Sequence, residues 1–140
     1  MSGADVMERL ASAYPGAETF TFGDGPDLCA ALLAAARSGA KTATCGALRD
    51  FEAGEPMPVV GRRDIALDRD GTPALVIETT EVTLVRFRDV PEGIALAEGE
   101  GTFEEWRMGH ERFFARNGGY DPEMMLVCER FRLLEDLDAR

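Results

Sequence analysis

The segment RDIALDRDGTPALVIETTEVTLVRF, residues 63–87, is the part of the sequence that decides the fold. Ile65-Ala66-Leu67 leads into Asp68-Arg69-Asp70-Gly71, which is a hairpin-turn signal, and Ala74-Leu75-Val76-Ile77 follows the turn. Val82 to Phe87 continues with apolar and β-branched residues and predicts another strand. We therefore expect this segment to form a β-meander.

Helices and shorter strands are predicted on both sides of the meander. Asp27 to Arg37 has helical spacing and is ended by Gly39, and Thr102 to Glu105 forms a capping box that opens another helix. The whole predicts an α+β fold, with a mostly antiparallel, barrel-like sheet and several helices packed on it. Residues 1–17 are expected to be an N-terminal helical extension, and residues 18–140 a single globular domain. The predicted flanking helices cover residues 5–14, 27–37 and 103–117, and the predicted flanking strands cover residues 19–22 and 124–134.

The charge balance bears on the kind of partner. The chain has 15 basic and 26 acidic residues, for a net charge of −11 at pH 7. Proteins that bind long nucleic acids carry clustered Lys and Arg, because counterion release from phosphates drives the binding. The longest basic run here is Arg62-Arg63. RNA is therefore disfavoured as a partner, and a small or neutral ligand is expected.

The location is also predicted from composition. No apolar run approaches the length that a bilayer requires, and the start of the chain lacks the basic-then-apolar layout of a signal peptide. Three cysteines without a CxxC pair fit a reducing compartment and offer neither a disulfide framework nor a zinc site. We expect a cytoplasmic protein with no membrane partner.

Lys41 is the residue that composition singles out, because the other 14 basic residues are all arginine. A coding bias toward arginine would drain lysine from the surface, and one lysine could also survive by chance. Lysine can lose its proton when it is desolvated, whereas arginine effectively cannot. Thr44 follows three residues later, and after the Gly39 helix stop a turn would bring the amine and the hydroxyl together. We interpret Lys41 as a catalytic base toward a Thr44 nucleophile.

A carboxylate would complete an acid–base set, and Glu98-Gly99-Glu100-Gly101 offers two. Glycines on both sides of Glu100 indicate a backbone bent to present that side chain. Composition alone favours the plainer interpretation, which is two solvated loop glutamates.

Six blocks in this order resemble the ASCH-domain family over residues 18–134: Phe22-Gly23-Asp24, Gly39 to Thr44, Thr79 to Val82, Glu98 to Gly101, Trp106-Arg107 with His110, and Phe113-Phe114. The resemblance implies a PUA-like fold, a small β-barrel with flanking helices. Some bacterial members of the family are amidohydrolases that act on N4-acetylcytidine and related N4-acylated cytosines. Others are regarded as RNA-binding proteins or ribonucleases.

The resemblance to the amidohydrolases implies a catalytic set of Lys41, Thr44 and Glu100, with Glu98 as the fallback carboxylate. Lys41 would activate Thr44 for attack on the acyl carbonyl, and Glu100 would protonate the departing amine and then activate water. Attack by a water that Glu100 activates directly remains an alternative. Neither route needs a metal or a cofactor, and the ligand would be a nucleoside or modified base.

Three further residues are expected to bind substrate. Cys45 and Gly46 follow Thr44 directly. The short amidohydrolases have a charged residue two positions after the threonine, where this chain has Gly46, so the substrate range is expected to differ. Backbone N–H groups of a turn at residues 42–46 could stabilise the oxyanion. Trp106 could stack on a base or pack in the core. His110 lies on the same apolar helix face and is interpreted as a hydrogen-bonded residue of the core or pocket edge.

Overall fold

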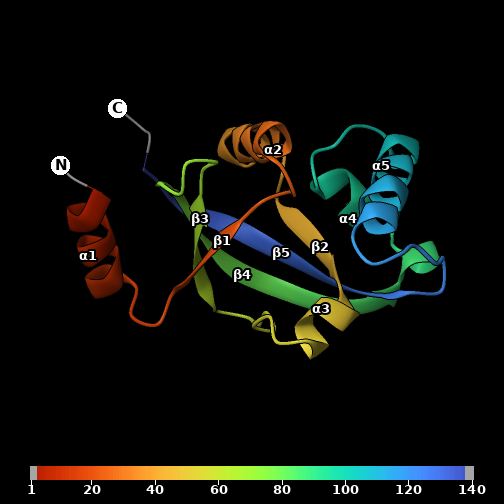
Figure 1. Ribbon diagram of the computed structural model, residues 1–140, viewed down its shortest axis with the longest axis horizontal. Coiled ribbons are helices and arrows are strands. Elements are labelled where there is room, and N and C mark those ends of the chain that lie inside the picture. The colour runs from red at the N-terminus through yellow and green to blue at the C-terminus, as the bar shows by residue number, and fades with distance from the viewer. Residues whose placement is uncertain (1–2, 138–140) are drawn as a thin grey trace.

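A computed structural model describes residues 3–137 of the chain. Within this range five strands form one sheet in the order β1-β3-β4-β5-β2 (Figure 1). β1 runs parallel to β3, and the other neighbouring strands are antiparallel. The strands are β1 (Glu18–Thr21), β2 (Ala43–Ala47), β3 (Arg63–Leu67), β4 (Pro73–Arg86) and β5 (Met125–Asp136). The helices are α1 (Gly3–Ala13), α2 (Pro26–Ser38), α3 (Leu48–Glu52), α4 (Glu92–Ala97) and α5 (Phe103–Arg116), with a 3-10 turn η1 at Phe87–Asp89.

The predicted meander forms, with one difference. β3 and β4 pair across the predicted hairpin turn, where the Asp68 side chain accepts hydrogen bonds from the Asp70 and Thr72 backbone amides. The two strands expected after the turn are one continuous strand, β4, of 14 residues. Its register with β5 shifts between Val76 and Ile77 and again between Thr79 and Glu81. Such irregularities increase local twist and let a long strand curl, so the sheet is a half-barrel with β1 and β2 at its two edges.

Helices cover the curled sheet at several places, which confirms the α+β class. α2 lies over the sheet, while α1 and the α4–α5 pair lie at opposite ends of the molecule (Figure 1). α2 buries Leu32, Leu33 and Ala36 against a cluster that includes Phe131 of β5. α5 buries Trp106, His110 and Phe114, whereas Phe103 at its start is 36% exposed. No helix of the described residues combines the length and apolar character needed to cross a membrane.

The turn expected at residues 42–46 is wrong, because this segment is strand β2. The chain leaves α2 through Gly39, whose φ of 88° is the left-handed conformation that glycine adopts easily. From Ala43 to Ala47 the residues pair with β5, opposite Arg130 through Leu126. Pairing with β5 satisfies backbone groups that a turn would leave open. The proposed role of turn N–H groups at an oxyanion therefore has no structural basis.

The first prediction concerns the N-terminal helix, which buries Leu10 completely against Ile65 and Val76. Leu10→Ala is expected to lower the free energy of unfolding by about 2–5 kcal/mol, because it leaves a cavity in a packed cluster. Urea denaturation followed by circular dichroism measures the change. The control is Glu8→Ala on the exposed side of α1, which should stay within about 0.5 kcal/mol of wild type. A loss below about 1 kcal/mol for Leu10→Ala would show that α1 is only loosely attached.

Candidate active site

The backbone around Lys41 is held at the junction of three elements. The Lys41 N–H donates to the Ala35 carbonyl near the end of α2, at 3.0 Å. The next amide, of Thr42, donates to the carbonyl of Ala97 at the end of α4, at 2.6 Å, and the Thr42 carbonyl accepts from Phe131 N–H of β5 at 2.9 Å. These bonds fix where the Lys41 side chain begins and direct it into the interior, where it is 1% exposed.

The Lys41 amine is surrounded by acceptors. Nζ donates to the Ala43 carbonyl at 2.8 Å, and it lies 3.4 Å from both the carbonyl and Oε1 of Glu98. The ring of Phe22 covers another side, with its centroid 5.3 Å from Nζ. An ammonium has three N–H donors and no acceptor, so three acceptors match its hydrogen-bonding capacity. The Lys41 amine is thus buried with its N–H groups satisfied, and it is not a surface charge.

Glu98 is the partner that makes this burial tolerable. The interpretation of Glu98 as a solvated loop residue is wrong, because its side chain is 2% exposed. Oε1 faces Lys41, while Oε2 accepts from the Trp106 indole N–H and lies 3.1 Å from Nε2 of His110. Burial by itself would raise the pKa of Glu98, but Lys41, His110 and Trp106 together lower this pKa to about 2. Glu98 therefore stays ionised at every physiological pH.

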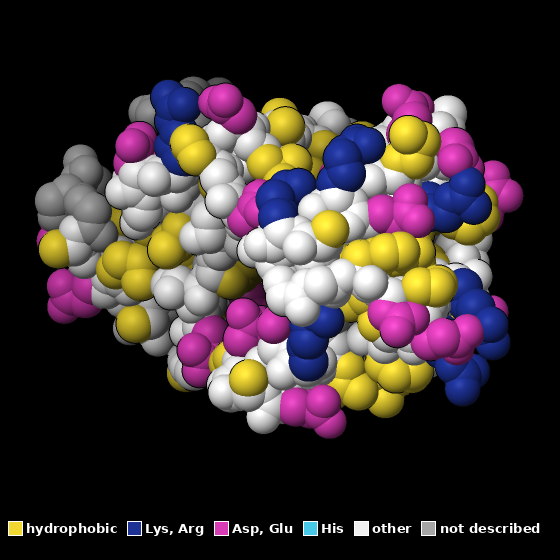
Figure 2. Space-filling model, turned by 45° about the vertical axis from the view of Figure 1, so that its right-hand side comes forward, with side chains coloured by type: hydrophobic (Ala, Val, Ile, Leu, Met, Phe, Trp, Pro, Cys, Tyr) yellow, Lys and Arg dark blue, Asp and Glu magenta, His cyan; other side chains and the backbone are white. Residues whose placement is uncertain are grey.

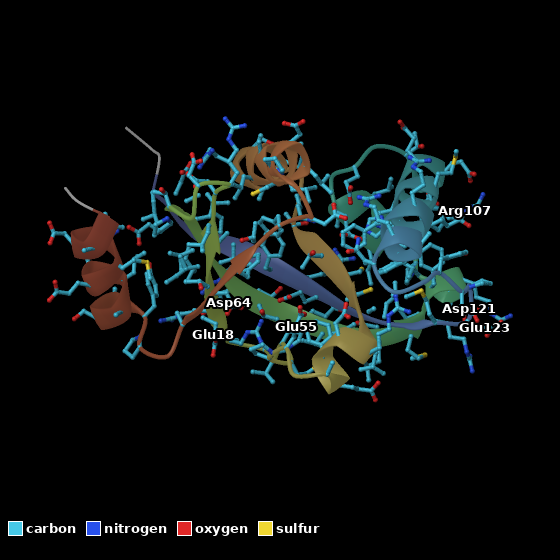
Figure 3. The ribbon with its side chains drawn as sticks, viewed as in Figure 1. Glu18, Glu55, Asp64, Arg107, Asp121 and Glu123 are labelled. Carbon is cyan, nitrogen blue, oxygen red and sulfur yellow. The ribbon has the colours of Figure 1, made fainter. Side chains whose placement is uncertain are left out.

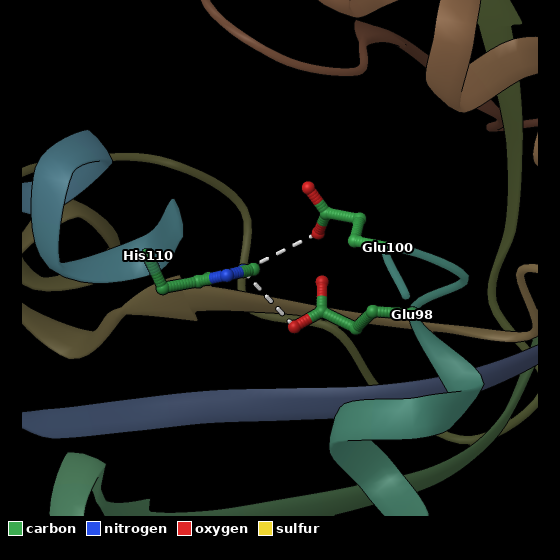
Figure 4. A group of neighbouring side chains, drawn as sticks. All are labelled: Glu98, Glu100 and His110. Carbon is green, nitrogen blue, oxygen red and sulfur yellow. Dashed lines mark ion pairs between the residues drawn. The ribbon is translucent and has the colours of Figure 1, made fainter. Parts of the chain in front are cut away.

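Glu100 occupies a different position from Glu98 (Figure 4). Its Oε2 lies 3.7 Å from Nε2 of His110, and its side chain keeps 27% of its exposure. Burial is the main cause that raises the pKa of Glu100, and the neighbouring Glu98 charge adds to the rise, while His110 opposes it. Of the two carboxylates, Glu98 contacts the Lys41 amine and Glu100 joins the network through His110. Glu100 is thus the one that can exchange a proton with a ligand.

Every polar contact of His110 is with a hydrogen-bond acceptor. Nδ1 lies 2.9 Å from the Trp106 carbonyl, and Nε2 faces carboxylate oxygens of Glu98 and Glu100. Both ring nitrogens must therefore carry a proton to donate, which is the imidazolium form. Burial would lower the pKa of His110, but Glu98 and Glu100 outweigh it and raise this pKa above its ordinary value. The interpretation of His110 as a hydrogen-bonded residue of the core and pocket edge is confirmed, since it is 8% exposed and lines the cleft.

The same three side chains are of the types that bind metal ions. One ligand atom from each of Glu98, Glu100 and His110 lies within 4.8 Å of the others. A metal would require His110 Nε2 without its proton, and it would have to displace Lys41 or Trp106 from Glu98. The contacts therefore favour a proton network over a metal site.

The bend between the two glutamates depends on Gly99. Its φ is 76°, and a Cβ there would lie 2.9 Å from the Ala40 carbonyl oxygen and 3.1 Å from the Cα of Lys41. Glycine thus lets the 98–101 loop pack directly against the backbone of Lys41. The bent backbone predicted from the flanking glycines is confirmed.

A cleft of about 940 Å³ opens beside this network. Lys41, Thr44, Cys45, Gly46, Glu98 and Glu100 line it. The volume is at the upper end of the range for small-molecule sites. Among the described residues no hydrogen bond joins the Lys41 amine to the Thr44 hydroxyl, so the two are brought to one cleft but not into direct contact.

Cys45 is not placed to act as a nucleophile, and Trp106 is not placed to stack on a ligand. The Cys45 thiol is hydrogen-bonded to Cys128, which faces it across β2 and β5, and this bond together with burial raises the pKa of Cys45 well above its ordinary value. A thiol of that kind is a poor nucleophile.

Trp106 is 1% exposed and stacks between Phe87 and His110, with ring centroids 5.4 and 4.5 Å from its own. The expectation that Trp106 binds substrate is therefore wrong: its ring packs in the core, and its N–H holds Glu98.

Two acidic residues of the cleft were missed in the sequence. Glu129 lies opposite Thr44 in the β2–β5 ladder, and its Oε2 accepts from the Thr79 hydroxyl at 2.7 Å. Asp64 on β3 is 3% exposed and pairs with Arg62 at 2.8 Å. Both also line the cleft. The available signal was a single charge next to an apolar run in a buried strand, Ile65-Ala66-Leu67 for Asp64 and Leu126-Val127-Cys128 for Glu129.

Comparison with known proteins places the chain in a family. The sequence model of the ASCH domain matches residues 18–135. This chain belongs to the ASCH-domain family. It is similar to the crystal structure of an ASCH domain from Lactobacillus crispatus JV V101, with 27% identity, a TM-score of 0.80, and coverage of 94% of this chain and 87% of that one. It is also similar to protein EF3133 from Enterococcus faecalis V583, with 30% identity, a TM-score of 0.83, and coverage of 94% and 88%. No curated protein matches the chain.

Membership in the ASCH-domain family confirms the resemblance drawn from the six sequence blocks. The PUA-like α+β fold that this resemblance implied is confirmed as well, as the curled half-barrel with its flanking helices. Helix α1 lies before the segment that the ASCH model matches.

The second prediction tests the buried ion pair. Lys41→Met and Glu98→Gln are each expected to cost about 3–5 kcal/mol of unfolding free energy, because each leaves a buried charge without its partner. The double variant should cost less than the sum of the two, with a coupling above about 1 kcal/mol. Urea denaturation of the four proteins gives the cycle.

The matched control for that cycle is the pair Arg63 and Glu78, which is 3.1 Å apart with Arg63 47% exposed. Its coupling should stay below about 1 kcal/mol, as solvent-exposed pairs do. Equal couplings for the two pairs would contradict the view that the Lys41–Glu98 contact is special.

The third prediction concerns the protonation of His110, which is the sole histidine of the chain. Its ring proton resonances should titrate with a pKa above 6.5. Glu98→Gln and Glu100→Gln should each move this pKa down, the former more. Because the folded-state pKa is raised, the stability from His110 is complete below the unfolded value and is lost as pH rises through the folded value. A pKa below 6.5 in wild type would contradict the imidazolium assignment.

Proposed function

We propose that this protein is an amidohydrolase that removes the acyl group from N4-acylated cytidine or cytosine. The observation that supports it most is the buried contact between the Lys41 amine and the Glu98 carboxylate, beside Thr44 in a cleft that can hold a nucleoside. A lysine kept from water and aimed by a fixed carboxylate is an arrangement suited to proton transfer. Membership in the ASCH-domain family adds to this support.

The proposed reaction has two stages. Lys41, in its neutral form, takes the Thr44 hydroxyl proton as the oxygen bonds to the acyl carbon. The C–N4 bond then breaks, and Glu100 gives its proton to the departing amine. Glu100 next takes a proton from water as the water oxygen attacks the acyl–threonine ester. The ester C–O bond breaks, the carboxylic acid leaves, and the Thr44 oxygen takes its proton back from Lys41. Glu98 holds Lys41 in place throughout and remains ionised.

The pKa directions support this division of roles. A general acid must carry a proton near neutral pH, and burial raises the pKa of Glu100 in that direction. Glu98, with a pKa of about 2, cannot serve as that acid. We therefore keep Glu100 as the proposed acid and assign the earlier fallback, Glu98, to positioning.

A ribonuclease or RNA-binding function has less support. Many arginines are already paired with carboxylates, such as Arg116 with Asp24 and both Arg86 and Arg88 with Glu123. On the face shown in Figure 2, acidic and basic side chains are interspersed, and no extended basic patch is seen. Phosphate binding along a strand requires such a patch.

The fourth prediction tests the amidohydrolase directly. Wild type should convert N4-acetylcytidine to cytidine, followed by liquid chromatography. Lys41→Arg and Thr44→Ala should each lower kcat/KM by at least about 100-fold, and Glu100→Gln should do the same, while Thr44→Ser, which keeps a hydroxyl, should retain partial activity. Mass spectrometry should detect an acyl group on Thr44 in variants that hydrolyse the acyl–threonine ester slowly. If wild type leaves N4-acetylcytidine and a panel of N4-acylcytosines intact, the proposal is wrong.

The variants also separate the two routes of attack. Activity that survives in Thr44→Ala would indicate direct attack by water that Glu100 activates. Activity that survives in Lys41→Arg would mean that a fixed positive charge is sufficient and that Lys41 is not the base.

A further inference from the structure

Glu129 is a half-buried carboxylate of the cleft that the proposed reaction does not use. It lies directly opposite Thr44 in the antiparallel pairing of β2 with β5. Residues that face each other across such a pair point to the same side of the sheet, with Cβ atoms about 4.5–5.5 Å apart. Both residues line the cleft. The Glu129 side chain therefore begins beside the side chain whose hydroxyl is the proposed nucleophile.

Thr79 fixes one oxygen of this carboxyl group. The register of β4 against β5 shifts between Thr79 and Glu81, and Thr79 is paired with Phe131. Phe131 and Glu129 are alternate residues of β5 and share one face of the sheet, so Thr79 points to that face as well. Thr79 is 1% exposed, and its hydroxyl donates to Glu129 Oε2 at 2.7 Å.

The other oxygen of Glu129, Oε1, is left for a ligand. No described residue donates a hydrogen bond to it. In the described part of the chain, the one enclosed side-chain nitrogen or oxygen that lacks a partner is Oδ1 of Asp64. Oε1 of Glu129 also lacks a partner and is not enclosed, so it is open to the cleft. A carboxylate oxygen in that position accepts from a donor that enters the cleft.

The basic groups near Glu129 are engaged with other carboxylates. Burial raises the pKa of Glu129, while Arg62 and Lys41 are close enough to oppose the rise. Arg62 pairs with Asp64 at 2.8 Å, and Lys41 contacts Glu98 at 3.4 Å. The donor that Oε1 lacks must therefore come from a ligand or from water. A ligand that donates to Oε1 also favours the ionised carboxylate.

The charge of the cleft restricts the kind of ligand that can bring this donor. Eight acidic and four basic side chains line the cleft. Three of the acidic ones, Glu18, Glu55 and Asp64, lie on the same side of the molecule, well away from Arg107 and Asp121 (Figure 3). A ligand that carries a carboxylate or a phosphate would be repelled there. A neutral ligand with an N–H donor meets no such penalty.

We propose that Glu129 is a specificity-determining residue whose Oε1 accepts a hydrogen bond from the N4–H group of the bound pyrimidine. This inference rests on the proposed function, because it takes the acylated N4 atom to lie at Thr44. N4 is bonded to the acyl carbon that Thr44 attacks, so its N–H comes within reach of a side chain beside Thr44. The site therefore selects pyrimidines with an N–H donor at position 4 over uridine, whose carbonyl oxygen there would face a carboxylate oxygen.

The fifth prediction tests the Glu129 contact by binding, without turnover. Isothermal titration calorimetry measures the affinities of cytidine, uridine and N4,N4-dimethylcytidine, which lacks both N–H donors. Wild type should bind cytidine at least about tenfold more tightly than either of the others, because the acceptor is charged. Glu129→Gln should bring the cytidine and uridine affinities to within about threefold of each other, since the glutamine amide can donate to uridine and accept from cytidine.

A second variant keeps the test valid if Glu129→Gln does not fold. Glu129→Asp retains the charge but withdraws the oxygens by one methylene, and it should also lose most of the preference for cytidine. The control is Glu81→Gln, which removes a charge that is 56% exposed. Glu81 is paired with Arg130, the neighbour of Glu129, and so lies on the opposite face of the sheet. This control should leave the preference for cytidine unchanged.

The ratio of the two affinities separates recognition from a merely structural role. If Glu129 only anchors Thr79, its replacement would weaken cytidine and uridine equally and keep the wild-type preference. That result in a folded Glu129 variant would overturn the inference. Equal affinities of wild type for cytidine and uridine, or no binding of cytidine, would overturn it as well.

Binding and hydrolysis fail separately. A preference for cytidine that depends on Glu129, without cleavage of N4-acetylcytidine, would support the Glu129 contact and refute the proposed function. Cleavage of N4-acetylcytidine together with equal affinities for cytidine and uridine would support the function and refute the Glu129 contact.

Discussion

The buried ion pair of Lys41 and Glu98 is the constraint around which this half of the molecule is arranged. Two charges that are 1% and 2% exposed are stable only when their remaining hydrogen-bonding capacity is filled. The end of α2 fixes the backbone of Lys41, and the end of α4 carries Glu98. α5 supplies the Trp106 indole and the His110 imidazole that complete the carboxylate. Three helices that are separate in sequence are thus tied to one pair of charges.

This arrangement divides two glutamates that are two residues apart into different chemical roles. Glu98 is enclosed and held in its charged form, whereas Glu100 reaches the cleft with a raised pKa. The left-handed backbone of Gly99 separates their directions and packs against Lys41. Environment, and not residue type, therefore decides which carboxylate can exchange a proton. The same logic excludes Cys45, whose pairing with Cys128 keeps the thiol protonated.

The acidic character of the chain continues into its cleft, where carboxylates outnumber basic groups. Arginines on the surface are largely engaged with neighbouring carboxylates, such as Arg9 with Glu135 and Arg132 with Glu78. A protein of net charge −11 with its cations so paired presents little that would hold a polyanion. This charge balance is the reason for which we propose a small neutral ligand.

The sequence by itself determined the elements whose signals are local: the hairpin at Asp68 to Gly71, the Gly39 helix stop and the Thr102 capping box. It also singled out Lys41 through composition. Spacing and glycines act over a few residues, so they can be recognised without a fold. Tertiary structure alone decided that residues 43–47 are a strand, because pairing with β5 outweighs any local turn preference. It also decided that the Trp106 indole donates a hydrogen bond to Glu98, and that Asp64 and Glu129 line the cleft. These roles depend on contacts between residues far apart in the chain, and a local pattern, such as a single charge next to an apolar run, does not specify the partner in such a contact.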